Sequence, residues 1–479
     1  MSDRPDASDE PAPTETVHDV LGVGLGPFNL GLAALVDGAN RDADVDENID
    51  VDAAFLEQDA EFAWHDGMLI EGATLEVPFL ADLVTMADPT TPHSYLNYLR
   101  ERDRLYEFYF YETFQIPRRE YDDYLRWVAD RLESCRFSRR VEEVVWDEET
   151  SRFTVTARNP ETDEETTYQA RNLALGIGSC PTIPEDLRGH PETDVFHTAE
   201  YRFRRERCLD ADSITVVGSG QSAAEVFQDL LVHQPEGDYR LDWLTRSEGF
   251  FPMEYSKLGL QHFTPEYDRY VYDLPQEVKD DLIPNQDLLY KGVDPETSAE
   301  IYDLLYRRSI GDRDPDVGLF AMTKVRDAEP VGDAYALDCH QWQADESFVH
   351  ESEVVVLGTG YERPTPDFLD PLEDAINWDE QGRFGVTEDH RLDIDVSGNV
   401  FLQNAEVHTH GVGAPDLGLG CYRNTAFVNR LVGHEVYPED TDTVYQDFSV
   451  EQFVERTPDA SRHSRSHESE PTPTPTRDD

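Results

Sequence analysis

The chain has 479 residues, of which 101 are Asp or Glu and 40 are Lys or Arg, so its formal net charge at pH 7 is −61. A charge of this sign disfavours binding to nucleic acid or to an anionic membrane. Hydrophobic residues still make up 38 % of the chain and aromatic residues 11 %, which suffices for globular cores and excludes general disorder. Acidic residues occur throughout, so we expect a protein that stays soluble at very high salt, where charge repulsion is screened. An acidic surface for a basic partner is the alternative.

The ends of the chain carry no targeting or membrane signal. Residues 1–16 are acidic and lack the apolar core of a signal peptide, and no stretch is apolar enough to span a bilayer. The five cysteines form no Cys-x-x-Cys pair, which predicts reduced thiols and a cytoplasmic protein. The residues after Pro458 are rich in Ser, His, Pro and Thr, and we expect this tail to be disordered.

A glycine-rich turn lies near the start of the chain. A short apolar run leads into three closely spaced glycines: Gly22, Gly24 and Gly26. Such a turn lets the backbone approach a pyrophosphate at the N-terminus of the helix that follows. Because Pro27 stands where a third glycine is expected, the motif alone fits a nucleotide site and an ordinary turn equally well. A second strand pattern at 51–56 ends at Glu57, which favours a hydrogen bond to a ribose over a simple surface acid.

The next hundred residues combine loops, helices and a β meander. Aromatic, Gly-containing segments at 62–68 and 74–85 indicate loops folded over a ligand, and helical patterns follow at 94–104 and 121–132. Arg118 and Arg119 stand just before the second helix, as either a solvated pair or a structural ion pair. Between 141 and 175 the pattern is that of β-strands separated by acidic turns.

A second glycine-rich turn has a clearer context than the first. A β-branched strand at 213–217 leads into Gly218-x-Gly220, and Ala223 takes the close-packing position of the next helix. The following strand ends at Arg246, where an arginine can meet a 2′-phosphate. The acid after the first turn and the arginine after the second therefore predict FAD at the first site and NADPH at the second.

The remainder predicts a helical insertion and further sheet. Residues 250–310 are helix-rich and contain many tyrosines, so we expect them to cover the cleft between two domains. Sheet pattern resumes at 325–337, and a buried strand at 354–357 ends in glycines. His408 and His410 alternate on what reads as an extended segment, without the spacing of a helical zinc pair, so no metal site is expected.

Several long motifs occur in one order over residues 17–436, and together they resemble the lysine/ornithine N-hydroxylase family of FAD- and NADPH-dependent monooxygenases in hydroxamate siderophore biosynthesis. The motifs are Gly24-Leu25-Gly26-Pro27-Phe28-Asn29-Leu30, Trp64-His65 with Gly67-Met68, Val77-Pro78-Phe79-Leu80 with Asp82-Leu83-Val84-Thr85, Gly218 to Glu225, and His408-Thr409-His410-Gly411. The family itself has Pro at the position of Pro27, so this residue supports the resemblance.

The resemblance implies an α/β fold with two dinucleotide-binding, Rossmann-like domains and a helical insertion that covers the substrate. It implies an FAD-binding domain in two parts, 17–204 and 353–440, an NADPH-binding domain at 205–352 with the insertion at about 250–310, and a C-terminal segment at 441–479. The residues implied to hold or adjoin FAD are Gly22, Gly24, Gly26, Pro27, Phe28, Asn29, Glu57, Trp64, His65, Met68, Leu417, Gly418 and Leu419. Those implied to hold NADPH are Gly218, Ser219, Gly220, Gln221 and Ser222, with Arg246. Glu76 departs from the family, which commonly has a Gln facing the flavin there.

The positions implied to meet the substrate also depart from the amino-acid hydroxylases. Ornithine hydroxylases carry a Lys at the position of Ala81 that holds the substrate carboxylate, and two assisting Asn residues align with Leu260 and Leu289. A carboxylate left unpaired among apolar groups costs several kcal/mol, so a substrate without a carboxylate fits better. The motifs are closest to the diamine-hydroxylating branch, which implies diaminopropane, putrescine or cadaverine, with O2 as co-substrate.

Other functions remain as alternatives. L-lysine or L-ornithine is the second choice of substrate, and a non-catalytic flavin- or nucleotide-binding sensor is a more distant possibility. A disulfide reductase is disfavoured because the chain has no Cys pair. No residue is assigned as a catalytic acid or base, and a homo-oligomer is compatible with the sequence.

Overall fold

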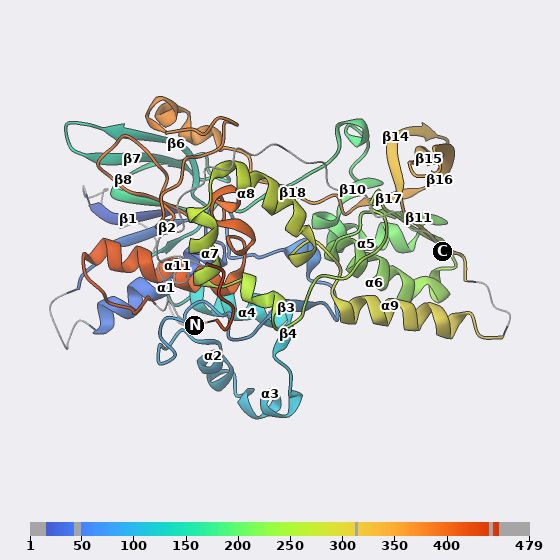
Figure 1. The fold of residues 1–479 in the computed structure, drawn as a ribbon, viewed down its shortest axis with the longest axis horizontal. Helices are drawn as coiled ribbons and strands as arrows, with labels where there is room; N and C mark the ends of the chain where they lie inside the picture. Colours follow the sequence, from blue (N-terminus) through green and yellow to red (C-terminus); the bar gives the residue numbers. More distant parts are fainter. Residues whose placement is uncertain (1–15, 43–48, 312–314, 440–443, 450–479) are drawn as a thin grey trace, which may run out of the picture.

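The computed structural model describes residues 16–42, 49–311, 315–439 and 444–449. The acidic N-terminus 1–16, which the sequence predicts to be disordered, lies outside the described residues except for residue 16, and so does the tail after Pro458. Two sheets stand at opposite ends of the molecule in Figure 1, the first with α1 and α11 and the second with α5 and α6, and a helical segment crosses between them.

The first sheet has seven strands in the order β5-β2-β1-β8-β7-β6, with β19 also paired to β8. These strands are β1 (Val17–Val23), β2 (Ala53–Leu56), β5 (Cys135–Arg136), β6 (Arg140–Asp147), β7 (Arg152–Arg158), β8 (Glu165–Leu175) and β19 (Val400–Leu402). The part containing β1 is parallel, whereas β6, β7 and β8 form an antiparallel meander. The predicted second strand and the predicted meander are therefore confirmed.

Alternation along β1 places apolar side chains on both faces of this sheet. Val20 belongs to the core beneath three helices: α1 (Pro27–Asp42), α4 (Arg118–Ala129) and α11 (Leu417–Val432). Leu21 and Val23 belong to the opposite core, which a 3-10 helix, η6 (Asp367–Ala375), helps to cover. A parallel sheet buried on both faces is the arrangement expected of a dinucleotide-binding domain.

Two short helices and a two-stranded antiparallel sheet extend from this first unit. α2 (Tyr95–Glu101) and α3 (Leu105–Tyr111) project away from the sheets at the bottom of Figure 1, and they are followed by β4 (Gln115–Pro117), which pairs with β3 (Thr74–Pro78). The helices expected at 94–104 and 121–132 correspond to α2 and α4. The separate helix α3 is an addition that the sequence pattern did not predict.

The second sheet is wholly parallel, with the order β10-β17-β11-β12-β13. Its strands are β10 (Val195–His197), β11 (Ser213–Val217), β12 (Arg240–Leu244), β13 (Val317–Phe320) and β17 (Val354–Leu357). One face packs on α5 (Tyr201–Leu209) and α6 (Gln221–Gly237). The other face packs on a three-stranded antiparallel sheet of β14 (Thr323–Val331), β15 (Ala334–Gln341) and β16 (Glu346–Ser352).

The second sheet corrects two of the expected domain boundaries. β17 pairs with both β10 and β11, so residues 354–357 lie in the second unit and not in the second part of the first. β10 joins the same sheet although it precedes residue 205. The boundaries at 204 and 353 were wrong because an all-apolar parallel strand, buried on both faces, does not reveal which of two sheets it enters.

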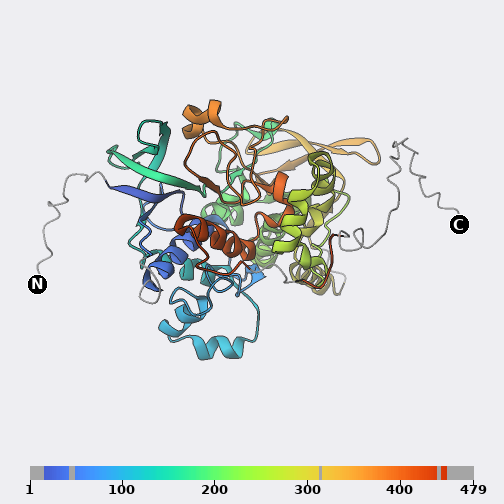
Figure 2. The ribbon, with the colours of Figure 1, turned by 60° about the vertical axis from the view of Figure 1, so that its left-hand side comes forward.

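The insertion is helical, as predicted, and it contacts both units. It contains α7 (Pro265–Asp273), α8 (Gln276–Leu282) and α9 (Pro295–Arg308), with 3-10 turns at Gly259–His262 and Ile283–Leu289. α7 and α8 contact α10 (Val407–His410) of the first unit, whereas α9 packs along α6 of the second. Figure 2 shows α7 and α8 beside α11 in a second view.

A short pair of strands brings together the two segments that connect the units. β9 (Cys180–Pro181) pairs with β18 (Tyr361–Glu362), so the two chain crossings between the units lie side by side. No helix within the described ranges has the length and apolarity needed to cross a membrane. All five cysteines are free thiols.

Candidate functional site

The first glycine-rich turn connects β1 to α1 through a backbone that only glycine adopts easily. Gly24 has φ +80°, and a Cβ there would lie 2.5 Å from the carbonyl oxygen of Gly176. A Cβ at Gly26, in contrast, would find no atom within 4 Å. The first turn of α1 contains no acidic residue, although the chain is strongly acidic. An open space at a helix N-terminus free of negative charge fits the pyrophosphate of a dinucleotide.

Asn29 and Phe28 fasten this turn to the rest of the first unit. The buried Asn29 amide donates to the carbonyl oxygens of Gly24 (2.8 Å) and Ala174 (3.1 Å). The Phe28 carbonyl accepts a hydrogen bond from Asn424 of α11 at 2.8 Å. These two residues therefore shape the loop, whereas Gly26 leaves room for a ligand.

Glu57 stands at the end of β2, as the sequence predicts for a ribose-binding acid. One of its carboxylate oxygens accepts a hydrogen bond from the Leu25 N–H at 2.9 Å, and the other accepts from the Asp59 N–H at 3.1 Å. The carboxylate thus orders the glycine-rich turn, and its half-buried position beside that turn is compatible with a ribose contact as well.

The N-terminus of α11 supplies the third part of this site. Asp416 caps the helix by accepting from the N–H groups of Gly418 (2.9 Å) and Leu419 (3.2 Å). Burial raises the pKa of Asp416 to about 6. A Cβ at Gly418 would lie 3.7 Å from that of Ala81, so the implied substrate position Ala81 adjoins this helix start.

The second glycine-rich turn, between β11 and α6, is as constrained as the first. Gly218 has φ +139°, and a Cβ there would lie 2.1 Å from the Gly358 carbonyl oxygen. α6 also begins without an acidic residue in its first turn. The Ser219 hydroxyl lies 3.0 Å from that of Ser247, and Arg246 is exposed just beyond β12. The implied contact of Arg246 with a 2′-phosphate remains a prediction.

A cavity of about 280 Å³ is lined by residues of both units. It brings together many residues singled out in the sequence: Trp64, His65, Met68, Glu76, Gln221, Ser222 and Leu417. It is also lined by residues that had not been assigned to a ligand: Leu75, Val77, Arg118, Tyr361, Pro415 and Asp416. His65 has φ 51°, an uncommon conformation for this residue type, and desolvation by the surrounding protein, with the charge of Arg118, lowers its pKa to about 4 although the side chain is open to solvent. The imidazole is therefore neutral at physiological pH.

Glu76 is the most unusual residue of this cavity. One carboxylate oxygen accepts from the Gln221 amide at 3.2 Å, while the other is buried without a hydrogen-bond partner. Burial first, and then the nearby carboxylates of Asp294 and Glu225, raise its pKa to about 8, while Arg118 acts in the opposite direction. A neutral carboxyl group at this position has the shape of the Gln that the resemblance implies.

Arg118 joins the two units through a buried ion pair with Glu225 of α6. Its Nη2 lies 2.6 Å and its Nη1 2.8 Å from the two carboxylate oxygens, and the same guanidinium donates to the carbonyls of Met68 and Thr74. Of the two roles left open for Arg118 and Arg119, Arg118 therefore forms a structural ion pair, while Arg119 is exposed. In the sequence, Glu225 stands out as an acid among the mostly apolar buried residues of α6, but nothing there identifies it as the partner of Arg118.

All three implied substrate positions lie outside the lining of this cavity, and Ala81 approaches it only at the start of α11. Leu260 is part of the 3-10 turn Gly259–His262, and Leu289 packs on the small core formed by Tyr267, Val271 and Val412. Both belong to the insertion, so their contact with a substrate remains a prediction.

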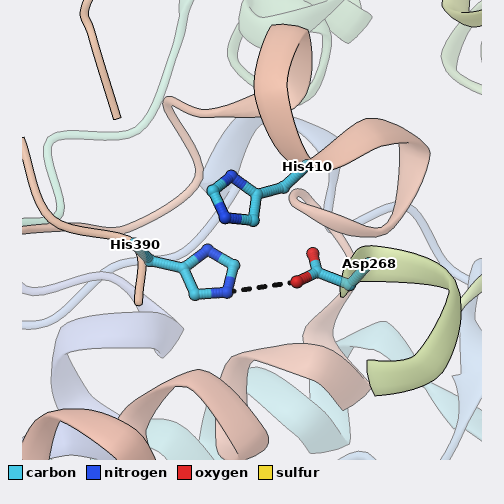
Figure 3. Close-up of side chains that lie close together, drawn as sticks. All are labelled: Asp268, His390 and His410. Atoms are coloured by element: carbon cyan, nitrogen blue, oxygen red, sulfur yellow. Dashed lines mark ion pairs between the residues drawn. The ribbon is translucent and has the colours of Figure 1, made fainter. Parts of the chain in front are cut away.

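A second group of titratable residues lies between α7 and α10, and it contains Asp268, His390 and His410 (Figure 3). The expectation that 408–410 is extended was wrong: Val407–His410 is a short helix, because the Glu406 carbonyl accepts from the N–H groups of Thr409 and His410. Period-two alternation over so few residues does not separate a strand from a helical turn.

The geometry of this group favours a structural charge network over a metal centre. Both ring nitrogens of His410 face hydrogen-bond partners, Thr409 Oγ1 at 2.8 Å and the Glu388 carbonyl at 3.3 Å. His390 lies between the carboxylates of Asp268 (3.3 Å) and Glu406 (3.4 Å), which raise its pKa to about 9 despite burial.

The network of Asp268, His390 and Glu406 continues to the glycine-rich turn of the first unit. Glu406 forms a buried ion pair with Arg423 of α11, whose guanidinium lies 4.9 Å from the centre of the Phe28 ring. The charges of Asp268, His390, Glu406 and Arg423 balance, which makes their burial tolerable. The network therefore ties the insertion to the glycine-rich turn.

We predict that Gly26→Ala weakens FAD binding without destabilising the fold. The added methyl group has no protein atom within 4 Å and can only obstruct a ligand. Fluorescence titration of apoprotein with FAD should show at least about a tenfold rise in Kd, while the urea midpoint is unchanged. Gly24→Ala, which clashes with backbone, should lower the urea midpoint instead; equal FAD affinity for Gly26→Ala and wild type would contradict the assignment.

Each unit has a glycine-rich turn between a strand with parallel neighbours and a helix, and two such turns are typical of proteins that bind two dinucleotides. A sequence model described as L-lysine 6-monooxygenase/L-ornithine 5-monooxygenase matches residues 16–363. The chain therefore belongs to this monooxygenase family, as the sequence motifs predicted.

Individual relatives agree with this assignment. The chain is 41 % identical over 445 residues to the rhizobactin siderophore biosynthesis protein RhbE of Rhizobium meliloti, covering 91 % of this chain and 96 % of that protein. It is 39 % identical over 436 residues to a putrescine N-hydroxylase of Shewanella oneidensis, covering 91 % and 84 %. The crystal structure of DfoA, a desferrioxamine-pathway cadaverine monooxygenase of Erwinia amylovora bound to FAD, matches with TM-score 0.85 at 39 % identity, covering 91 % and 99 %.

The expected enzyme class and cofactors are confirmed at the level of the family. A solved ornithine N-hydroxylase from Kutzneria, described with reduced FAD, NADP⁺ and L-ornithine, matches with TM-score 0.79 at 27 % identity, covering 87 % of this chain and 99 % of that one. The fold prediction of two Rossmann-like domains is confirmed by these same structures. Which residues of this chain contact each cofactor remains a prediction.

Proposed function

We propose that this protein is an FAD- and NADPH-dependent monooxygenase that N-hydroxylates one amino group of a diamine, such as diaminopropane, putrescine or cadaverine, for hydroxamate siderophore biosynthesis. The observation that carries the choice of substrate is Ala81, an apolar residue beside the start of α11. Amino-acid hydroxylases that the chain resembles use a lysine there to hold a carboxylate. The putrescine and cadaverine enzymes among its relatives support the same choice.

Different segments of this chain would bind the two cofactors. The turn at Gly22–Gly26 and the N-terminus of α1 hold FAD, and the turn at Gly218–Gly220 with Arg246 holds NADPH. Reduced flavin supplies the chemistry that activates O2. The neutral Glu76 and the Gln221 amide line the cavity between the two nucleotides without placing a negative charge beside the flavin.

The protein must also bind the substrate amine in its neutral form, because a protonated amine has no free electron pair. Apolar cavity walls such as Trp64, Met68 and Leu417 disfavour the charged form of a bound amine and lower its pKa. The helical insertion, fastened to the first unit by the contact of Asp268 with His390, would exclude water from the site. No side chain is needed as a nucleophile.

The charge and the thiols of the chain suggest its surroundings. A net charge of −61 is compatible with a folded protein when molar salt screens the repulsion, so we propose a cytoplasm rich in salt. The five free thiols and the use of NADPH fit a reducing compartment. A small amine and O2 are the proposed partners, without nucleic acid or membrane.

The direct test measures NADPH oxidation and hydroxylamine formation by FAD-reconstituted protein with putrescine and cadaverine, at low and at molar KCl. We expect hydroxylamine in proportion to NADPH consumed at molar KCl and little activity at low salt. Failure to bind FAD under both conditions would eliminate the monooxygenase and leave the nucleotide sensor. NADPH oxidation without any hydroxylamine would eliminate the amine as substrate.

A further inference from the structure

Asp416 has one carboxylate oxygen that the protein itself leaves unused. Its Oδ1 caps α11 by accepting from the N–H groups of Gly418 and Leu419. Its Oδ2 accepts no hydrogen bond and forms no ion pair with any residue that the structure describes, and protein atoms do not enclose it. The side chain is half-buried and lines the cavity of about 280 Å³. An oxygen that can accept a hydrogen bond is therefore open to this cavity.

The nearby arginines leave Asp416 without a cationic partner. Arg118, which lines the same cavity, donates from both terminal nitrogens to Glu225, at 2.8 Å and 2.6 Å. Arg423 lowers the pKa of Asp416 by its charge, but it forms its own buried ion pair with Glu406. A cation that pairs with Oδ2 must therefore come from a ligand.

The other titratable groups of the cavity do not compensate the charge of Asp416. His65 and Glu76 are both neutral at pH 7, because their pKa values are about 4 and about 8. Burial raises the pKa of Asp416 to about 6, so it is ionised at pH 7. The cavity thus has one uncompensated negative charge among walls that are otherwise largely apolar, which favours a cationic ligand group.

Ala81 lies close enough to Asp416 to matter for this charge. A Cβ on Gly418 would lie 3.0 Å from Asp416 Oδ1 and 3.7 Å from the Ala81 Cβ, so these two atoms are at most about 7 Å apart. A lysine at position 81, as in the amino-acid hydroxylases that the chain resembles, could reach this carboxylate on its flexible aliphatic stem. With alanine there, the chain lacks that cation and leaves its place free.

We propose that Asp416 binds the ammonium group at the far end of the substrate and so makes the cavity selective for a diamine over a monoamine of the same length. This inference rests on the proposed function, because it concerns the end of the amine that is not hydroxylated. The reacting amino group must lose its proton, whereas the distal group keeps its proton and donates to Oδ2. A charge-assisted hydrogen bond of this kind is about twice as strong as a neutral one.

An organic ammonium suits this position better than an inorganic cation. Hard metal ions take six or more oxygen ligands, whereas Asp416 offers a single free oxygen. An ammonium on an alkyl chain needs only one such acceptor and also fills the apolar part of the cavity. Because the pair is shielded from solvent, molar salt weakens it much less than a pair on the surface.

The test compares kcat/KM for cadaverine and n-pentylamine, which differ only in the distal amino group, using FAD-reconstituted full-length protein with NADPH in molar KCl. Wild type should prefer cadaverine at least about 30-fold, because n-pentylamine leaves the Asp416 carboxylate desolvated and unpaired. Asp416→Asn keeps a helix cap of equal quality but removes the charge. In this variant the preference should fall to within about threefold, through a higher KM for cadaverine and an unchanged or lower KM for n-pentylamine.

Two control variants and a check of folding accompany this comparison. Glu71→Gln, at an exposed acid before β3, should leave the kinetics of both amines unchanged. Glu76→Gln replaces a neutral acid by a neutral amide and should keep the preference for cadaverine, whatever it does to kcat. Circular dichroism and FAD content show whether each variant is folded.

The outcomes separate this inference from the proposed function. Loss of the preference in Asp416→Asn, with its retention in both controls, supports the inference. A folded, FAD-containing Asp416→Asn that still prefers cadaverine as strongly as wild type would overturn it and leave the proposed function intact, and so would equal kcat/KM for the two amines in wild type. Hydroxylamine from neither amine would overturn both.

Discussion

Replacing Arg118 by methionine is expected to lower the free energy of unfolding by about 3–5 kcal/mol, because it leaves the Glu225 carboxylate buried without its partner. Glu225 is 4 % exposed and cannot regain solvent without opening the contact between the two units. The guanidinium also satisfies the carbonyls of Met68 and Thr74, which would lose a donor. Urea titrations in molar KCl, followed by tryptophan fluorescence, measure this loss.

Two further variants separate the buried pair from other effects. Arg119→Met, at the exposed neighbouring residue, should change the free energy of unfolding by less than about 0.5 kcal/mol. Combining Arg118→Met with Glu225→Leu should recover most of the loss, since no unpaired charge remains. A stability for Arg118→Met within about 1 kcal/mol of wild type would mean that the ion pair does not join the units.

Replacing Glu76 by glutamine is expected to stabilise the apoprotein at high pH by about 3–5 kcal/mol. The pKa of Glu76 is raised from 4.5 to about 8 by burial, and each unit is worth about 1.4 kcal/mol. As the pH rises from 4.5 to 8, the unfolded wild-type chain loses a proton that the folded chain keeps, so wild-type stability falls over this window and levels off above it. Glutamine has no such proton to lose.

The difference between the two proteins is the measured quantity. Urea titrations at a series of pH values should show Glu76→Gln and wild type converging near pH 4.5 and diverging up to pH 8. Glu71→Gln, at an exposed acid that precedes the same strand, is the control and should follow wild type within about 0.5 kcal/mol throughout. A constant difference across the series would show that Glu76 is ionised in the folded protein.

Local patterns were sufficient to predict the elements that carry the cofactors. The turns at Gly24 and Gly218 were predictable because glycine spacing and the strand before it are properties of a few consecutive residues. Glu57 and Arg246 follow directly from the ends of the neighbouring strands. The corrected strand β17 shows the limit, since an apolar run specifies burial but not the sheet that buries it.

The contacts between distant segments were not predictable from the sequence. Arg118 and Glu225 are 107 residues apart, and nothing local to either residue identifies the other. His390, Asp268 and Glu406 come from three separate segments of the chain. The pKa of His390 is raised only because the two carboxylates lie beside it. Such pairings depend on how the two sheets and the insertion pack, which single-residue patterns do not contain.

The central claim is that a diamine is hydroxylated in preference to an amino acid. It is tested by comparing kcat/KM for cadaverine, putrescine, L-lysine and L-ornithine with FAD and NADPH in molar KCl, with product identified by mass spectrometry. We expect a diamine to be preferred at least about 100-fold, because a substrate carboxylate beside Ala81 would be desolvated and unpaired. Preferential hydroxylation of L-lysine or L-ornithine would contradict the account.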